Sequence, residues 1–233
     1  DFGSETRSKR EATAELCALL AFSATHNDDK VGLTLFHGAI EQYIPARKGQ
    51  KHSLRVIREV LAHGSGDTPE EVEQAQRVRR RWLPFGRRRA WWRTKRQATS
   101  VAGAMEFLMS VTTRKTACFV VSDFFDEGYL EAMRSANRKH DVVAVLVTDP
   151  RELQMPNVGL VTLADAESGQ TAVLDTGSSA FRHTVQRAAR QRIDELERTF
   201  RGNKIDFIHI DASGSVVDPL VKFFRMRERR MRR

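Results

Sequence analysis

The sequence contains little cysteine and no long hydrophobic run. Only Cys17 and Cys118 occur in its 233 residues, each within a short apolar segment. We therefore expect two buried free thiols and a reducing compartment rather than a disulfide framework. No run of about 18 apolar residues is present, which excludes a membrane-spanning helix within this sequence, and no signal peptide is recognisable. Because the chain begins with Asp1 rather than Met, we interpret it as a fragment or processed product, and a membrane anchor could lie outside it.

Motifs of the common enzyme classes are also missing. The sequence has no Walker A pattern, no G-x-G-x-x-G and no G-x-S-x-G turn, so the corresponding nucleotide-binding and hydrolase chemistries are not indicated. Its seven histidines are scattered over predicted helices and loops, and none stands at a metal-ligand spacing. We interpret them as surface or core residues, and we predict no catalytic residue.

Acidic residues are missing from one long stretch, and this absence locates most of the positive charge. The net charge is +9, but ten basic residues and no acid lie between Arg77 and Arg96. Six arginines and a single acid, Glu228, lie between Arg225 and Arg233, and the rest of the chain has a net charge of −6. A mildly acidic body argues against a domain whose whole surface binds nucleic acid.

Hydrophobic patterning predicts regular alternation of strands and helices. A helical period is present over residues 7–27, 53–63, 99–111, 127–139, 180–200 and 216–225. Short apolar runs predict strands over residues 31–36, 41–44, 116–121, 142–147, 158–163, 171–174 and 205–210. The second strand should pair with the first and end at Pro45, and 158–163 should pair with 171–174. This order indicates an α/β fold, with a mostly parallel sheet and helices on both faces.

One segment departs from this alternation. We interpret the chain as a single domain over residues 1–233, with a basic insertion at about 66–98 and a basic tail at about 225–233. All three tryptophans lie in the insertion, which could bind anionic lipid, nucleic acid or an acidic protein. The alternatives are a solvated loop and packing of the tryptophans on the host domain. The candidate binding residues are Arg79, Arg80, Arg81, Trp82, Arg87, Arg88, Arg89, Trp91, Trp92 and Arg93.

Carboxylates follow two of the predicted buried strands. Asp123 comes after the strand 116–121, with Asp126 and Glu127 close behind it, and Asp149 follows the strand 142–147. Ligands of parallel sheets bind beyond the carboxyl ends of the strands, and clustered carboxylate oxygens suit a hard cation such as Mg²⁺. The alternative is that such an aspartate only caps the next helix.

The order of short motifs resembles the domain of unknown function 58 family. Each motif is weak alone, but together they cover nearly the whole chain outside the insertion. They include Asp1-Phe2-Gly3-Ser4, Pro45-Ala46-Arg47-Lys48-Gly49, Ser122-Asp123-Phe124, His140-Asp141-Val142, Asp149-Pro150-Arg151-Glu152 and Phe223-Phe224-Arg225. That family is similar to von Willebrand factor A domains, so the resemblance implies a Rossmann-type fold of that kind.

The resemblance also implies a metal-ion-dependent adhesion site. In such sites a D-x-S-x-S motif ends the first strand, and a threonine and an aspartate from later loops complete the ligands. Thr99 and Asp123 match those two positions, although Ser100 stands where the family commonly has an acid. The D-x-S-x-S motif and the first, central strand are missing from this chain. We therefore expect Mg²⁺ or Mn²⁺ binding in the full-length protein, and weak or no binding here.

The function that follows from the resemblance is a non-catalytic interaction domain. It would act with a MoxR-type AAA+ ATPase in the assembly or maturation of protein complexes. It would be a cytoplasmic domain that segments outside this chain could tether to the inner membrane. One alternative is a metal-dependent phosphoesterase or nuclease that uses Asp123, Asp126 and Asp149. Another is a lipid- or nucleic-acid-binding module that uses the insertion, although the acidic body argues against nucleic acid.

Overall fold

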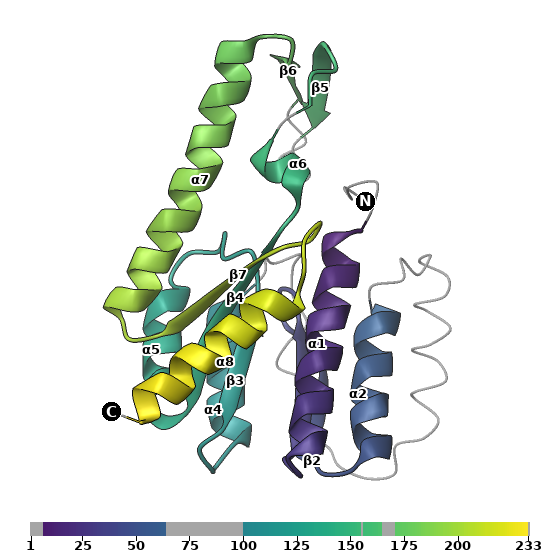
Figure 1. The fold of residues 1–233 in the computed structure, drawn as a ribbon, viewed down its shortest axis with the longest axis vertical. Coiled ribbons are helices and arrows are strands. Elements are labelled where there is room, and N and C mark those ends of the chain that lie inside the picture. The colour runs from purple at the N-terminus through teal and green to yellow at the C-terminus, as the bar shows by residue number, and fades with distance from the viewer. Residues whose placement is uncertain (1–6, 64–99, 155, 165–170, 233) are drawn as a thin grey trace.

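The centre of the molecule is a three-stranded parallel sheet. The computed structural model describes residues 7–63, 100–154, 156–164 and 171–232 (Figure 1). The sheet has the strand order β3-β4-β7, formed by β3 (Ala117–Val121), β4 (Asp141–Thr148) and β7 (Asp206–Asp211). Neighbouring strands are parallel, so their carboxyl ends lie at one edge, as the alternating sequence pattern predicts.

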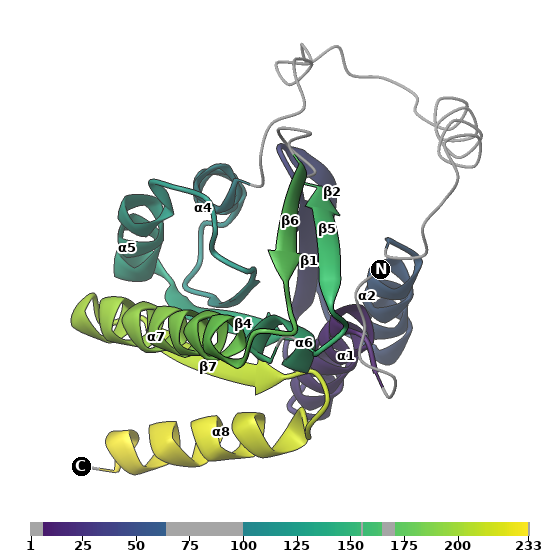
Figure 2. The ribbon, with the colours of Figure 1, turned by 90° about the horizontal axis from the view of Figure 1, so that it is seen from above.

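Helices cover both faces of this sheet. The described helices are α1 (Lys9–His26), α2 (Gln50–His63), α4 (Val101–Val111), α5 (Tyr129–Lys139), α6 (Pro150–Leu153), α7 (Ser179–Gly202) and α8 (Val217–Met231). Figure 2 shows α5 and α7 on one side of β4 and β7, and α8 on the other. The predicted arrangement, a parallel sheet between two layers of helices, is confirmed for these three strands.

Strand β4 explains why both faces must be covered. Its side chains are apolar from Val142 to Val147 and alternate between two hydrophobic clusters. Val142 and Leu146 belong to the cluster formed with α4, α5 and α7. Val143 and Val145 belong to the cluster formed with α1 and α8. A strand with apolar side chains on both sides is stable only in the middle of such a sandwich.

A β-hairpin beside α1 and α2 makes a second, separate sheet. Strands β1 (Val31–Phe36) and β2 (Ile40–Arg47) pair in antiparallel fashion. The prediction that Pro45 ends the second strand is wrong, because β2 continues to Arg47. Leu33 pairs with Ile44 and Val31 with Arg47, so Pro45 falls at a register irregularity. A proline is tolerated there because a bulged residue need not donate to the ladder.

The third sheet is the predicted second hairpin. Strands β5 (Leu160–Ala164) and β6 (Thr171–Asp175) pair in antiparallel fashion, as the sequence predicts. The turn between them lies outside the described residues. Figure 1 shows this hairpin and the amino-terminal half of α7 at one end of the molecule, next to α6.

The last helix is longer than the sequence pattern predicts. The periodicity ends near residue 225, whereas α8 continues to Met231. Arg227 binds the carboxylate of Asp141 through two contacts of 2.6 Å, and Arg230 lies 2.9 Å from Asp206. The segment predicted as a basic tail therefore belongs largely to a helix that two aspartates hold against the sheet.

Both cysteines are free, as expected, and each is only partly exposed. Loss of hydration raises the pKa of Cys17 to about 11 and that of Cys118 to about 12, so neither thiol is activated at neutral pH. Among the described residues, no helix is long and apolar enough to cross a membrane.

Candidate functional site

The loop that follows β3 forms the candidate site at the carboxyl edge of the sheet. Ser122 donates its backbone N–H to the carbonyl of Val145, which continues the sheet pairing by one residue. Phe124 has a φ of 54° and is 4% exposed. Its ring packs 5.0 Å from that of Phe200 in α7. This buried ring anchors the loop, so the residues on either side of it point outward from a fixed base.

Asp123 lies on the exposed side of this loop. Its Oδ1 accepts a hydrogen bond of 3.3 Å from the backbone N–H of Phe125, which closes a short turn. Its backbone carbonyl accepts a 2.6 Å hydrogen bond from Arg192 of α7. Asp123 is therefore exposed at the edge where the sequence places it, and Arg192 holds its backbone carbonyl.

Asp126 joins this loop to the start of α4. Its Oδ2 accepts a 2.8 Å hydrogen bond from the backbone N–H of Val101. Its Oδ1 is buried and has no hydrogen-bond partner among the described residues. Burial raises the pKa of Asp126, the Val101 hydrogen bond opposes this rise, and the negative charge of Asp123 adds to it.

Phe125 and Arg192 form an exposed pair beside Asp123. The ring of Phe125 is 71% exposed, and the guanidinium carbon of Arg192 lies 3.7 Å from the ring centroid. Such stacking is a cation–π contact. Sequence patterns do not reveal it because the two residues come from separate elements.

Asp149 does not join the other two aspartates. It is 0% exposed and caps α6, where its Oδ1 accepts a 2.8 Å hydrogen bond from the N–H of Arg151. Glu152 completes a capping box and lies 2.9 Å from Lys9 of α1. The helix-capping alternative considered for this aspartate is therefore the one observed.

The oxygen donors of this edge suit Mg²⁺ or Mn²⁺ in kind but not in number. Carboxylate and hydroxyl oxygens are the ligands of hard cations. Within the described part of the chain, however, no group of three or more His, Cys, Asp or Glu side chains is arranged to hold a metal ion. Asp123 is thus at most one member of a ligand set. Thr99 and the predicted binding residues of the insertion lie outside the described residues.

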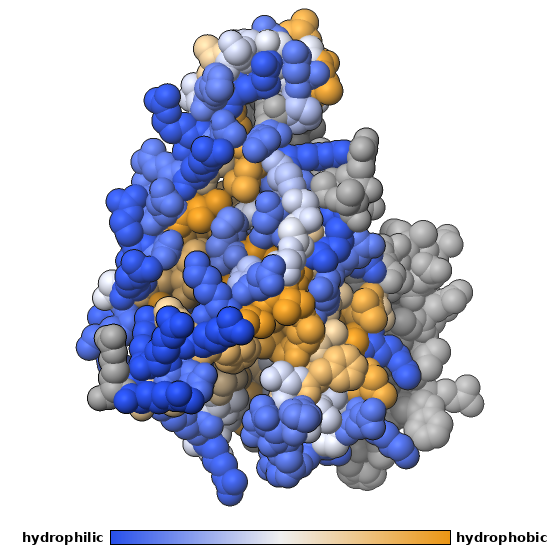
Figure 3. All heavy atoms as spheres, in the orientation of Figure 1, coloured by the Kyte–Doolittle hydropathy of each residue, from blue (hydrophilic) through white to orange (hydrophobic). Residues whose placement is uncertain are grey.

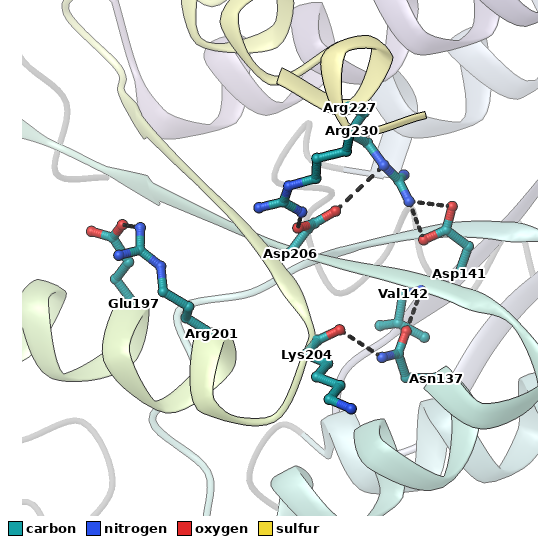
Figure 4. A network of polar contacts seen from close by, with 9 residues as sticks. All are labelled: Asn137, Asp141, Val142, Glu197, Arg201, Lys204, Asp206, Arg227 and Arg230. Carbon is teal, nitrogen blue, oxygen red and sulfur yellow. Dashed lines mark hydrogen bonds and ion pairs between the residues drawn. The ribbon is translucent and has the colours of Figure 1, made fainter. Parts of the chain in front are cut away.

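A second polar cluster lies at the opposite, amino-terminal ends of β4 and β7 (Figure 4). Arg227 binds Asp141 and also lies 3.4 Å from Asp206, which Arg230 contacts as well. Arg227 and the two aspartates are largely buried, with side chains between 19% and 31% exposed. This cluster attaches α8 to the sheet, and it was missed by reasoning from sequence, which treated the arginines only as a basic tail.

An apolar region is exposed between α8 and α1. Figure 3 shows hydrophobic atoms gathered at this place in the orientation of Figure 1. Phe224 of α8 is 43% exposed and lies 6.4 Å, centroid to centroid, from Phe119 of β3. Phe119 and Val121 are only partly buried. Strand β3 pairs with β4 alone among the described strands, so its other edge adjoins this apolar region.

These features define an α/β protein with a parallel sheet covered on both faces and an acidic loop at its carboxyl edge. The chain belongs to the family described as protein of unknown function DUF58, which it matches over residues 1–195. The family inferred from the motifs is thereby confirmed.

Sequence comparison finds relatives that are named as uncharacterized proteins. Uncharacterized proteins of Mycobacterium tuberculosis and Mycobacterium bovis are 26% identical to the chain over 230 residues, or 98% of it. The chain spans 64% of the length of these relatives.

The crystal structure of the conserved hypothetical protein BatB from Bacteroides thetaiotaomicron is similar in fold. Its TM-score is 0.52 at 15% identity, and the match covers 94% of this chain and 87% of that one. An aerotolerance-related membrane protein from Bacteroides fragilis matches with a TM-score of 0.47 at 13% identity, over 94% and 90% of the two chains.

Proposed function

We propose that this chain is the larger part of a von Willebrand factor A-like interaction domain that binds a protein partner without catalysis. The observation that carries the proposal is the loop after β3. It holds the exposed carboxylate of Asp123 at the carboxyl edge of a parallel sheet, and Asp126 ties it to the segment that directly follows Thr99. Binding at this edge is the general rule for open α/β sheets.

The proposal includes a further strand beside β3. Strand β3 has no second partner among the described strands, and its side chains Phe119 and Val121 adjoin exposed apolar surface. Helix α1 contacts both β1 and β4, so it covers the space between the hairpin and the parallel sheet. A strand placed there would join the two sheets and cover that surface. The carboxyl end of that strand would place further oxygen ligands for a metal ion beside Asp123.

A metal titration tests this proposal. We expect Mg²⁺ or Mn²⁺ to bind weakly to this chain and much more tightly to a longer version of the protein that includes the residues preceding Asp1. The substitution Asp123→Ala should abolish the tighter binding, because it removes a ligand without disturbing the buried ring of Phe124. Equally tight binding by both lengths of the protein would contradict the proposal.

The partner we propose is a MoxR-type AAA+ ATPase, and the longer protein would be tethered at the membrane. The family resemblance supports both ideas. Binding would be measured by calorimetry between the longer protein and such an ATPase, with and without Mg²⁺. Metal-dependent binding that Asp123→Ala removes is the expected result, whereas binding that is independent of both metal and Asp123 would refute this use of the site.

A phosphoesterase or nuclease is less well supported. Such an enzyme needs carboxylates converging on one or two metal ions. Asp149 instead caps α6 from a fully buried position, which leaves Asp123 and Asp126 as the pair on the loop.

A further inference from the structure

Asp126 makes the hydrogen bond that links two parts of the candidate site. Val101 is the first residue of α4, and first-turn N–H groups lack a partner within their own helix. The Ser100 hydroxyl accepts a 3.1 Å hydrogen bond from the N–H of Gly103. The N–H of Val101 instead donates to the carboxylate of Asp126, 25 residues further along the chain. A carboxylate at a helix amino terminus is also favoured by the helix dipole.

The two neighbouring acids do not make this link. Asp123 uses its Oδ1 within its own loop, on the N–H of Phe125. Glu127 is exposed and makes no hydrogen bond or ion pair among the described residues. Among the described residues, Asp126 is the only one of the three whose carboxylate binds a different element, whereas Asp123 is linked to α7 only through its backbone carbonyl.

We propose that Asp126 is a positioning residue, which fixes the loop carrying Asp123 against the start of α4 and thereby the spacing of the partner-binding edge. This inference rests on the proposed function, in which that edge binds the partner. Asp126 acts through Val101 and does not itself contact the partner. Its Oδ1 is buried without a donor among the described residues, a cost in stability that suits a positioning role better than a purely stabilising one.

Amide hydrogen exchange on this chain tests the link directly. In Asp126→Ala, the N–H of Val101 should exchange roughly tenfold faster, because it loses a hydrogen bond to a charged acceptor. In Asp126→Asn, exchange should stay near that of the unmodified protein, because the amide oxygen can still accept the bond. Glu127→Ala is the matched control, since it removes a neighbouring negative charge and leaves Val101 untouched.

Line broadening by Mn²⁺ provides a readout that general destabilisation does not give. At millimolar Mn²⁺, the amide signals of Asp123 and Phe125 should broaden in the unmodified protein, in Asp126→Asn and in Glu127→Ala. They should broaden less in Asp126→Ala at the same degree of folding, checked by thermal melting.

Unchanged exchange of Val101 in Asp126→Ala would overturn the inference, as would exchange in Asp126→Asn as fast as in the alanine variant. If Mn²⁺ broadened no signal near Asp123 in the unmodified protein, the proposed metal site would fail in this chain. The exchange data would still decide whether Asp126 holds the loop. If the alanine variant failed to fold, the asparagine variant would decide the matter.

Discussion

His209 is a single residue whose protonation should affect the stability of the whole sheet. It lies in β7, and its Nε2 is 2.8 Å from the hydroxyl of Thr148 in the neighbouring strand β4. Burial lowers the pKa of His209, and the smaller effects of Asp211 and Glu197 oppose this shift. The folded state therefore favours the neutral imidazole more than the unfolded state does.

The sign of the pH effect follows from that difference. Below the ordinary histidine pKa of about 6.5, the unfolded chain binds more protons at this position than the folded chain. The free energy of unfolding should therefore fall as the pH falls from 7.5 to 5.5. In His209→Gln, which can still hydrogen-bond to Thr148 but does not titrate, the fall should be smaller. Urea unfolding at pH 7.5 and 5.5 measures the fall in the free energy of unfolding for each protein. An equal fall in the two proteins would show that His209 is not the residue responsible.

Helix α8 shows how charged residues that the sequence presents only as a basic tail can stabilise an element of the fold. In Arg227→Ala, Asp141 loses its guanidinium partner and Asp206 loses one of two. The expected cost is roughly 1–2 kcal/mol, less than for a fully buried pair because the arginine side chain is 26% exposed.

The control for this substitution is on the same helix. Arg225 is exposed and makes no ion pair among the described residues, so Arg225→Ala should change the free energy of unfolding by less than about 0.5 kcal/mol. The difference between the two variants should shrink at high salt, where charges are screened. Equal stabilities of the two variants in urea unfolding at low salt would show that the cluster does not hold α8.

Most elements could be predicted from sequence because their patterns are local. The apolar run from Val142 to Val147 predicts a strand buried on both faces. The position of Asp123, just after the strand 116–121, predicts that it lies at the carboxyl edge of the sheet. Long-range partners are not encoded locally. Asp126 meets Val101 across 25 residues, and Arg192 meets Asp123 across 69. The end of α8 was misjudged for the same reason, since Arg227 finds its partner 86 residues away.

At the scale of the whole molecule, the proposed partner-binding edge and the densest positive charge lie in different parts of the sequence. The described body supplies the folded edge with Asp123, whereas residues 77–96 contain ten of the basic residues and no acid. The elements on either side of the predicted insertion have contacts of their own. Helix α2 packs on α1, and Ser100 donates its N–H to the carbonyl of His37 at 3.0 Å.

Deleting residues 77–97 should therefore preserve the fold and weaken binding to anionic lipid. The net charge falls from +9 to −1, so affinity for vesicles containing anionic lipid should drop about tenfold or more, with the remainder less sensitive to salt. Melting temperature and circular dichroism should change little. Sedimentation with anionic and neutral vesicles measures the difference.

Replacing the ten basic residues of the segment with glutamine, at unchanged length, separates the effect of lost charge from the effect of a shorter chain. If the shortened protein still sedimented with anionic vesicles as strongly as the complete chain, the insertion would have no part in membrane binding, and α8 with its exposed Arg225 and Arg229 would become the surface to test.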